Sequence, residues 1–211
     1  MSKDREIEAK TILAKNVYQK ISKAFPIKED FQQANYYFDT DDNLLKKHNI
    51  GCRIRIFSDH AEQTLKVPDP RPVQKKFHEV IEINDKLKLE EANSLIKKAQ
   101  TNDYFIFQGN IGQYLSKHFA DKQKKLRLQT WSKTHRILAN GPENCELTFD
   151  ATSYPDGFED YEFEIENTNP TLIKKILIQL EKKYGFKQTA NNTNQNKIAR
   201  ARSEERRVGK E

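Results

Sequence analysis

Charged side chains stand at every second position in several short stretches of this 211-residue chain. Near the N-terminus, Glu6, Glu8 and Lys10 alternate with apolar residues, and in the run 160–166 every even position is acidic. Because successive side chains of a β-strand point to opposite faces, each stretch predicts a strand with one charged and one apolar face. A solvated charged face is the simpler interpretation of either stretch alone. Together they predict a metal site, because carboxylates bind hard divalent cations through oxygen.

A second group of predicted strands carries basic side chains. Arg53 and Arg55 share one face of the segment 51–57, with isoleucines on the other, and Lys66 shares a face with Thr64 in the segment 62–67. Arg and Lys bind phosphate oxygens, Arg through a bidentate fork. Carboxylates with a cation and basic groups around a polyphosphate are therefore the chemistry that the charged faces predict together.

The segment 133–136 leaves its strand register open. It reads Lys-Thr-His-Arg, and either Lys133 and His135 or Thr134 and Arg136 occupy the charged face. A shift of one residue exchanges the two faces of a strand.

The segment 77–84 alternates less regularly than the other predicted strands. Glu79 shares a face with Ile81 and Ile83, and Glu82 lies on the opposite face. Glu79 thus lies on a face that is otherwise apolar.

Helices are predicted between and after these strands. Apolar residues recur four apart from Leu13 to Phe25, and similar stripes run through 90–100 and 111–119. Another stripe begins at Pro170 and ends at Gly185, two residues that favour the first turn and the C-terminal cap of a helix. Closing the strands into a barrel would place these helices over the apolar faces and gather the charged faces in a polar lumen. The predicted class is α+β.

Composition restricts the class of protein. The net charge of +6 is spread among charges of both signs instead of forming one basic block, so a nucleic-acid partner is not expected. Two distant cysteines, Cys52 and Cys145, predict a reducing compartment, and no apolar run approaches the ~20 residues that span a bilayer. We expect a cytoplasmic protein with one domain, residues 1–200, followed by a disordered or non-native tail, residues 201–211.

The chain resembles a known family over residues 4–200. The run Glu6-Ile7-Glu8-Ala9-Lys10 is similar to the ExExK signature of the CYTH superfamily, the triphosphate tunnel metalloenzymes. The similarity continues in order through Tyr37-Phe38-Asp39-Thr40, Arg53-Ile54-Arg55, Thr64-Leu65-Lys66, Glu79, Thr134 to Ile137, Asp150, Glu162-Phe163-Glu164 and Asn196-Lys197. One five-residue motif is a weak signal in a charged sequence, whereas the ordered set is a strong one.

The resemblance implies a closed eight-stranded antiparallel β-barrel with helices packed outside, of the bacterial inorganic triphosphatase type. It implies that Glu6, Glu8 and Glu164 bind the metal that holds the triphosphate, with Glu79 as a further ligand candidate. Glu162 and Asp150 would serve a second metal and the attacking water, and with Lys10 they form the predicted catalytic set. The phosphate-contacting residues implied are Lys10, Arg53, Arg55, Lys66, Arg136 and Lys197.

The function expected from these residues is hydrolysis of a triphosphate, with inorganic tripolyphosphate as the favoured substrate and Mg2+ or Mn2+ as the cofactor. The resemblance also allows an adenylyl cyclase of the class IV type, which would release cyclic AMP. Two non-enzymatic alternatives remain, a polyphosphate- or nucleotide-binding module and a half-solvated sheet without a ligand. The expected partner is a small-molecule triphosphate or polyphosphate, with no nucleic acid, no membrane, and a homodimer as an optional assembly.

Overall fold

The computed structural model describes residues 2–72, 77–101, 107–119, 126–193 and 197–201, without the side chains of residues 2–6 and His78. Eight strands close into an antiparallel barrel in the order β1-β5-β4-β3-β2-β6-β7-β8. The strands are β1 Ser2–Ile12, β2 Ile27–Asp39, β3 Gly51–Ile56, β4 Ala61–Pro68, β5 His78–Leu87, β6 Arg127–Asn140, β7 Glu146–Ser153 and β8 Glu159–Glu166. The predicted fold class is confirmed.

Helices connect several of the strands and, among the described residues, three more helices follow the last strand. The helices are α1 Lys15–Ile21, α2 Leu44–Lys47, α3 Leu89–Gln100, α4 Gly109–Phe119, α5 Pro170–Tyr184, α6 Ala190–Thr193 and α7 Lys197–Ala201, with a short 3-10 turn, η2, at Pro142–Asn144. In the described ranges, none of these helices is both long and apolar enough to cross a bilayer.

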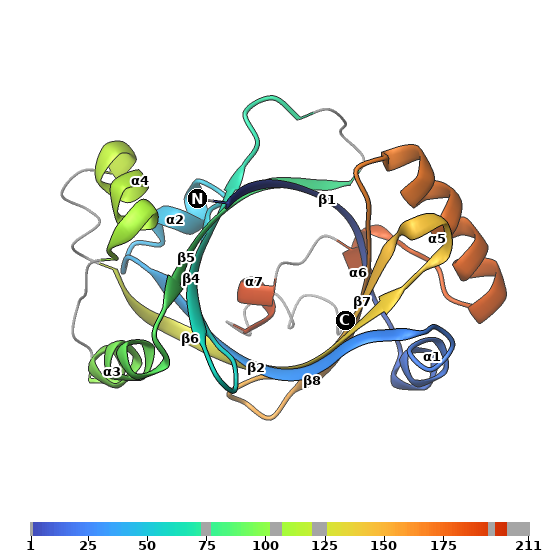
Figure 1. Cartoon of the computed structure of the whole chain (residues 1–211), viewed down its shortest axis with the longest axis horizontal. Coiled ribbons are helices and arrows are strands. Elements are labelled where there is room, and N and C mark those ends of the chain that lie inside the picture. Colours follow the sequence, from blue (N-terminus) through green and yellow to red (C-terminus); the bar gives the residue numbers. More distant parts are fainter. Residues whose placement is uncertain (1, 73–76, 102–106, 120–125, 194–196, 202–211) are drawn as a thin grey trace. The chain divides into compact units, whose positions relative to one another are not determined.

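The chain divides into two compact units, each assembled from separate segments. Unit 1 comprises Met1–Arg5, Gln33–Pro70 and Val80–Ser132, and unit 2 comprises Glu6–Gln32, Arg71–Glu79 and Lys133–Glu211. Within unit 2, β1 and β7 pair with the two edges of β8, and α1 and α5 contact β8 (Figure 1). Within unit 1, β2, β3, β4 and β5 pair in sequence, and α3 and α4 contact β4.

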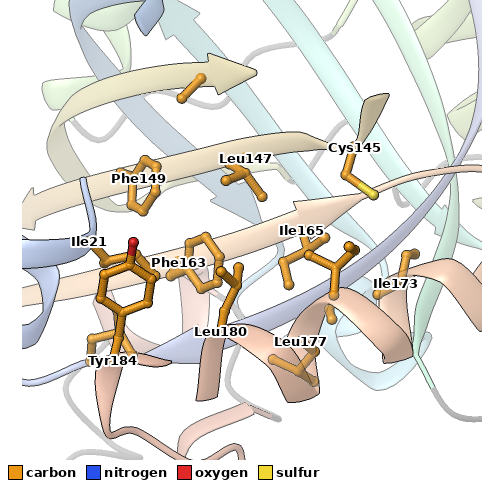
Figure 2. Packing of buried hydrophobic residues seen from close by; sticks show 14 of the residues in the cluster. Ile21, Cys145, Leu147, Phe149, Phe163, Ile165, Ile173, Leu177, Leu180 and Tyr184 are labelled. Carbon is orange, nitrogen blue, oxygen red and sulfur yellow. The ribbon is translucent and has the colours of Figure 1, made fainter. Parts of the chain in front are cut away.

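The apolar faces of β7 and β8 form the core of unit 2. Phe149 and Phe163 stack with their ring centroids 5.1 Å apart and are fully buried. Figure 2 shows them together with Leu180 and Tyr184 from α5. Burial of one such side chain contributes roughly 1.5–3 kcal/mol to stability. This packing fixes β8 with its apolar residues toward the helices, so its acidic residues must point to the other face.

The ends of α5 follow the predicted signals. The side chain of Asn169 accepts hydrogen bonds from the backbone N–H groups of Thr171 and Leu172, and Pro170 occupies the first turn. Gly185 ends the helix with φ at 73°, a left-handed conformation in which a Cβ would be strained.

The first half of β2 is charged and exposed. The strand begins at Ile27, because its charged first half is anchored in unit 2 by side chains that are distant in sequence. Asp30 lies 2.5 Å from Nε2 of His135, and Nζ of Lys28 lies 2.5 Å from Glu146. The exposed residues 27–30 have no apolar alternation, and periodicity therefore missed them.

Candidate functional site

Three buried carboxylates form the centre of the site in unit 2. Asp150 on β7 lies directly opposite Glu162 on β8, and Glu164 follows Glu162 on the same face. Each of the three offers an oxygen atom within 4.8 Å of the others. Like charges this close repel one another in a low dielectric, so the group requires cations between its members.

Lys197 and Arg136 supply positive charge to this group. Nζ of Lys197 forms close ion pairs with Asp150 and Glu162 and lies 3.8 Å from Oε1 of Glu164. Arg136 donates from Nε to Oδ1 of Asp150 at 2.8 Å and from Nη2 to Oδ2 at 2.6 Å. Nη2 of Arg136 also lies 3.7 Å from Glu164. Two of the predicted phosphate-contacting residues therefore contact predicted metal ligands.

Strand β1 brings a further pair of charges. Lys10 stands opposite Glu164 in the pairing of β1 with β8, forms an ion pair with the buried Glu8, and lies 3.9 Å from Oε1 of Glu164. The side chain of Glu6 lies outside the described residues. Among the described residues of the predicted site, unit 2 thus contains Glu8, Lys10, Arg136, Asp150, Glu162, Glu164 and Lys197 in one connected network.

The carboxylates have different protonation equilibria. Burial raises the pKa of Glu164 to about 8, partly offset by Lys197 and reinforced by the negative charges of Glu8 and Glu162. Burial opposes ionisation of Glu162 as well, but Arg200, Lys197 and Lys10 hold the pKa of Glu162 well below its usual range. Burial also opposes ionisation of Asp150, but Arg136 and Lys197 outweigh it, so the pKa of Asp150 is lowered. In the absence of a cation, burial thus favours the protonated form of Glu164, whereas the basic groups favour the ionised forms of Asp150 and Glu162.

Sequence reasoning missed a second buried cluster next to these groups. Arg200 of α7 is 2% exposed, and its guanidinium lies 2.7 Å from Asp160 and 2.8 Å from Glu162. The hydroxyl of Tyr154 donates to Asp160 at 2.8 Å and accepts from Nε of Arg200 at 3.1 Å. The signal that could have identified it is the spacing of Lys197 and Arg200, which places two basic side chains on one helix face.

In unit 1, Arg53 and Lys66 share a carboxylate partner. Nζ of Lys66 lies 2.7 Å from Oε1 of Glu82, and Nη2 of Arg53 lies 3.8 Å from the same atom. Burial would raise the pKa of Glu82, but the two basic groups lower it to about 2. Glu82 therefore stays ionised at neutral pH and belongs to the charged face.

Arg55 has its own polar partners in unit 1. It donates to Oδ1 of Asn35 at 3.2 Å and to Oε1 of Glu62 at 3.1 Å, both on neighbouring strands. Cys52 and Ile54, which alternate with Arg53 and Arg55 along β3, are fully buried on the opposite face of the strand. The predicted assignment of Arg53, Arg55 and Lys66 to one charged face is confirmed.

Strand β5 reveals a residue that the predictions overlooked. Lys66 stands opposite Glu82, and Thr64 stands opposite Asn84. Glu79 lies on the same face of β5 as Ile81 and Ile83, whose side chains belong to the apolar core of unit 1. Glu82 is thus the acidic partner of the basic face, and the role predicted for Glu79 stays a prediction.

The open register on β6 is resolved. Arg136 contacts Asp150, and Oγ1 of Thr134 lies 3.0 Å from Oγ1 of Thr152, with both threonines buried. Lys133 is exposed, so Thr134 and Arg136 occupy the charged face.

The model of the CYTH domain matches residues 4–200. The chain belongs to the CYTH domain family. Over 87 residues, 40% of this chain, it is 36% identical to YjbK of Bacillus subtilis (strain 168), which carries a provisional triphosphatase name, and the match spans about half of that relative, 46% of its length.

Two solved structures resemble this CYTH chain along most of its length. A Bacillus halodurans protein with the provisional name adenylate cyclase is 28% identical, with a TM-score of 0.79 and coverage of 95% of this chain and 98% of that one. HpAC1 from Hippeastrum, provisionally named an adenylyl cyclase and described as having a dominant triphosphatase activity, is 22% identical, with a TM-score of 0.74 and coverage of 94% and 95%. The second likeness concerns the fold alone.

Proposed function

We propose that this CYTH protein is a divalent-metal-dependent hydrolase of triphosphates, with inorganic tripolyphosphate as its favoured substrate. The observation that carries the proposal is the group of three buried carboxylates, Asp150, Glu162 and Glu164, held together with Lys197 and Arg136. Burying charges is costly, and clusters of buried, pKa-perturbed groups are typical of functional sites. Membership of the CYTH family and the triphosphatase name of YjbK support the same reaction.

The donor atoms fit a hard divalent cation. Carboxylate oxygens suit Mg2+ and Mn2+, whereas the described part of this group offers no sulfur or imidazole that would favour a softer metal. Asp150, Glu162 and Glu164 would hold the cation, with Glu8 as a further ligand and Glu6 and Glu79 as predicted ones. When bound, the cation neutralises charge on phosphoryl oxygens and activates water for attack.

The remaining roles belong to the basic side chains. Lys10, Arg136 and Lys197 in unit 2 would bind phosphate oxygens and stabilise the charge that develops on the transferring and leaving groups. Arg53, Arg55 and Lys66 in unit 1 stay predicted phosphate contacts. Their present carboxylate partners keep them oriented before the substrate arrives. Glu162 and Asp150, whose pKa values are lowered, would serve the attacking water as hydrogen-bond acceptors.

The test measures orthophosphate release from tripolyphosphate, ATP and thiamine triphosphate, each with Mg2+, with Mn2+ and with a chelator. We expect metal-dependent release that is fastest with tripolyphosphate and is reduced at least about 100-fold by Glu162→Gln. Glu143→Gln, at an exposed ion pair with Lys175, serves as the control and should retain full activity. Absence of metal-dependent release from all three substrates would contradict the proposal.

An adenylyl cyclase is the second candidate, and the observation that favours it is the name of the Bacillus halodurans protein. Cyclic AMP formed from ATP in the same assay would identify it, since hydrolysis forms orthophosphate instead. Tight binding of tripolyphosphate without turnover, retained in Glu162→Gln, would identify a binding module. A cytoplasmic location and a homodimer stay predictions.

A further inference from the structure

The short helix α7 has little stability of its own. It contains five residues, Lys197–Ala201, and an isolated helix of this length does not persist in water. Yet Arg200 and Ala201 are 2% and 5% exposed, so the helix is held against the rest of unit 2. The ion pairs of Lys197 and Arg200 contribute to that attachment.

Two basic residues of α7 match the carboxylates of β8. Lys197 and Arg200, three residues apart, lie on the same side of the helix, and Asp160 and Glu162 lie on one face of the strand. Glu162 contacts both basic groups, and Asp160 contacts Arg200. Two cations on two acids define the helix position along the strand, whereas a single ion pair would leave it free to slide or turn.

Arginine suits this position better than lysine. The planar guanidinium reaches Asp160, Glu162 and the hydroxyl of Tyr154 at once, and Tyr154 links Arg200 to Asp160 by two hydrogen bonds. An ammonium group is a point charge without this fixed fork. The arrangement therefore sets the orientation of Arg200 as well as its location.

We propose that Arg200 is a positioning residue, which fixes α7 on β8 so that Lys197 stays on the Asp150, Glu162 and Glu164 carboxylates. Removal of Arg200 would leave the ion pairs of Lys197 to hold α7 on β8 and would loosen the place of Lys197. The effect of Arg200 on catalysis rests on the proposed function, in which Lys197 binds phosphate. The effect of Arg200 on the position of Lys197 is independent of the proposed function.

The first experiment measures how fast an amine-acylating reagent modifies Lys197 in the full-length, metal-free protein, by mass spectrometry. Lys28, whose side chain is 47% exposed, gives the internal reference rate. We expect Arg200→Met to raise the relative rate at Lys197 at least about tenfold, as for a local opening. Arg200→Lys should give an intermediate rate, and Lys175→Met, at a surface ion pair, should leave the rate unchanged.

Should Arg200→Met not fold, Tyr154→Phe, which keeps every charge and removes the hydroxyl link, replaces it with a smaller expected increase. An unchanged rate at Lys197 in the folded variants would overturn the proposal. This readout requires no catalysis, so its failure is distinct from failure of the proposed triphosphatase activity.

The second experiment compares kcat and KM for tripolyphosphate in Arg200→Met, Lys197→Met and the double variant. If Arg200 acts through Lys197, the double variant loses no more than Lys197→Met alone, and Arg200→Lys recovers part of the loss. Effects that multiply in the double variant would show that Arg200 acts independently and would overturn the positioning role. A general loss of stability would not produce this non-additivity.

Discussion

Glu162 and Glu164 lie on the same face of β8, yet neutralising each should change stability in opposite directions. The pKa of Glu164 is raised to about 8 from its usual 4.5, while that of Glu162 is held well below its usual value. A raised pKa means that the folded protein retains a proton that the unfolded chain has released. Stability from this proton is fully present below pH 4.5 and is lost as the pH rises to 8.

The magnitude follows from the two pKa values of Glu164. Each pH unit between them corresponds to about 1.4 kcal/mol, so the full effect approaches roughly 5 kcal/mol above pH 8. Glu164→Gln mimics the protonated acid and does not titrate. The variant should therefore match the wild type below pH 4.5 and exceed it in free energy of unfolding by roughly 2–5 kcal/mol at pH 8–9.

Glu162→Gln should instead lower the free energy of unfolding. It removes a negative partner from Lys197 and Arg200 and leaves their buried positive charges under-compensated. Loss of one partner from a buried ion pair costs about 3–5 kcal/mol. Because the folded pKa of Glu162 is lowered, the deficit is present above pH 4.5 and shrinks as the pH falls toward the folded pKa.

The assay is equilibrium urea unfolding of the chelator-treated protein between pH 4 and 9, followed by far-UV circular dichroism. Glu143→Gln, at an exposed ion pair, is the control and should stay within about 0.5 kcal/mol of the wild type. The reasoning is refuted if Glu164→Gln is less stable than the wild type at pH 8. That result would mean that Glu164 is an ordinary ion-paired carboxylate.

Three further outcomes are expected. Lys66→Met should weaken binding of tripolyphosphate with Mg2+ by about 10- to 100-fold in calorimetry. The melting temperature should change little, since the side chain of Lys66 is 30% exposed. Unfolding of the variant would contradict this role. Arg136→Met should lower the free energy of unfolding by about 3–5 kcal/mol, because Asp150 is 0% exposed and loses a bidentate partner. A change below about 1 kcal/mol in urea titration would argue against that pairing. Gly185→Ala should lower the free energy of unfolding by about 1 kcal/mol in the same titration, because φ at this position is 73°. Full activity with unchanged stability would contradict the capping assignment.

Strand alternation made much of the charged face predictable. Phe163 and Ile165 must be buried, and the period of two then assigns Glu162 and Glu164 to the other side without any coordinates. The same logic placed Arg53 and Arg55 together. Pro170 and Gly185 similarly determined where α5 begins and ends, because the physical preferences of these residues are local.

Only the tertiary structure decided the contacts that depend on register and docking. On β6, polar residues on both faces gave no burial difference, so the choice of Arg136 over His135 required the partner strand that carries Asp150. Glu82 was passed over because its partner, Lys66, lies on a different strand. The spacing of Lys197 and Arg200 indicates a shared helix face, but the sequence does not say where a five-residue helix docks. Buried carboxylates elsewhere in the chain determine that place.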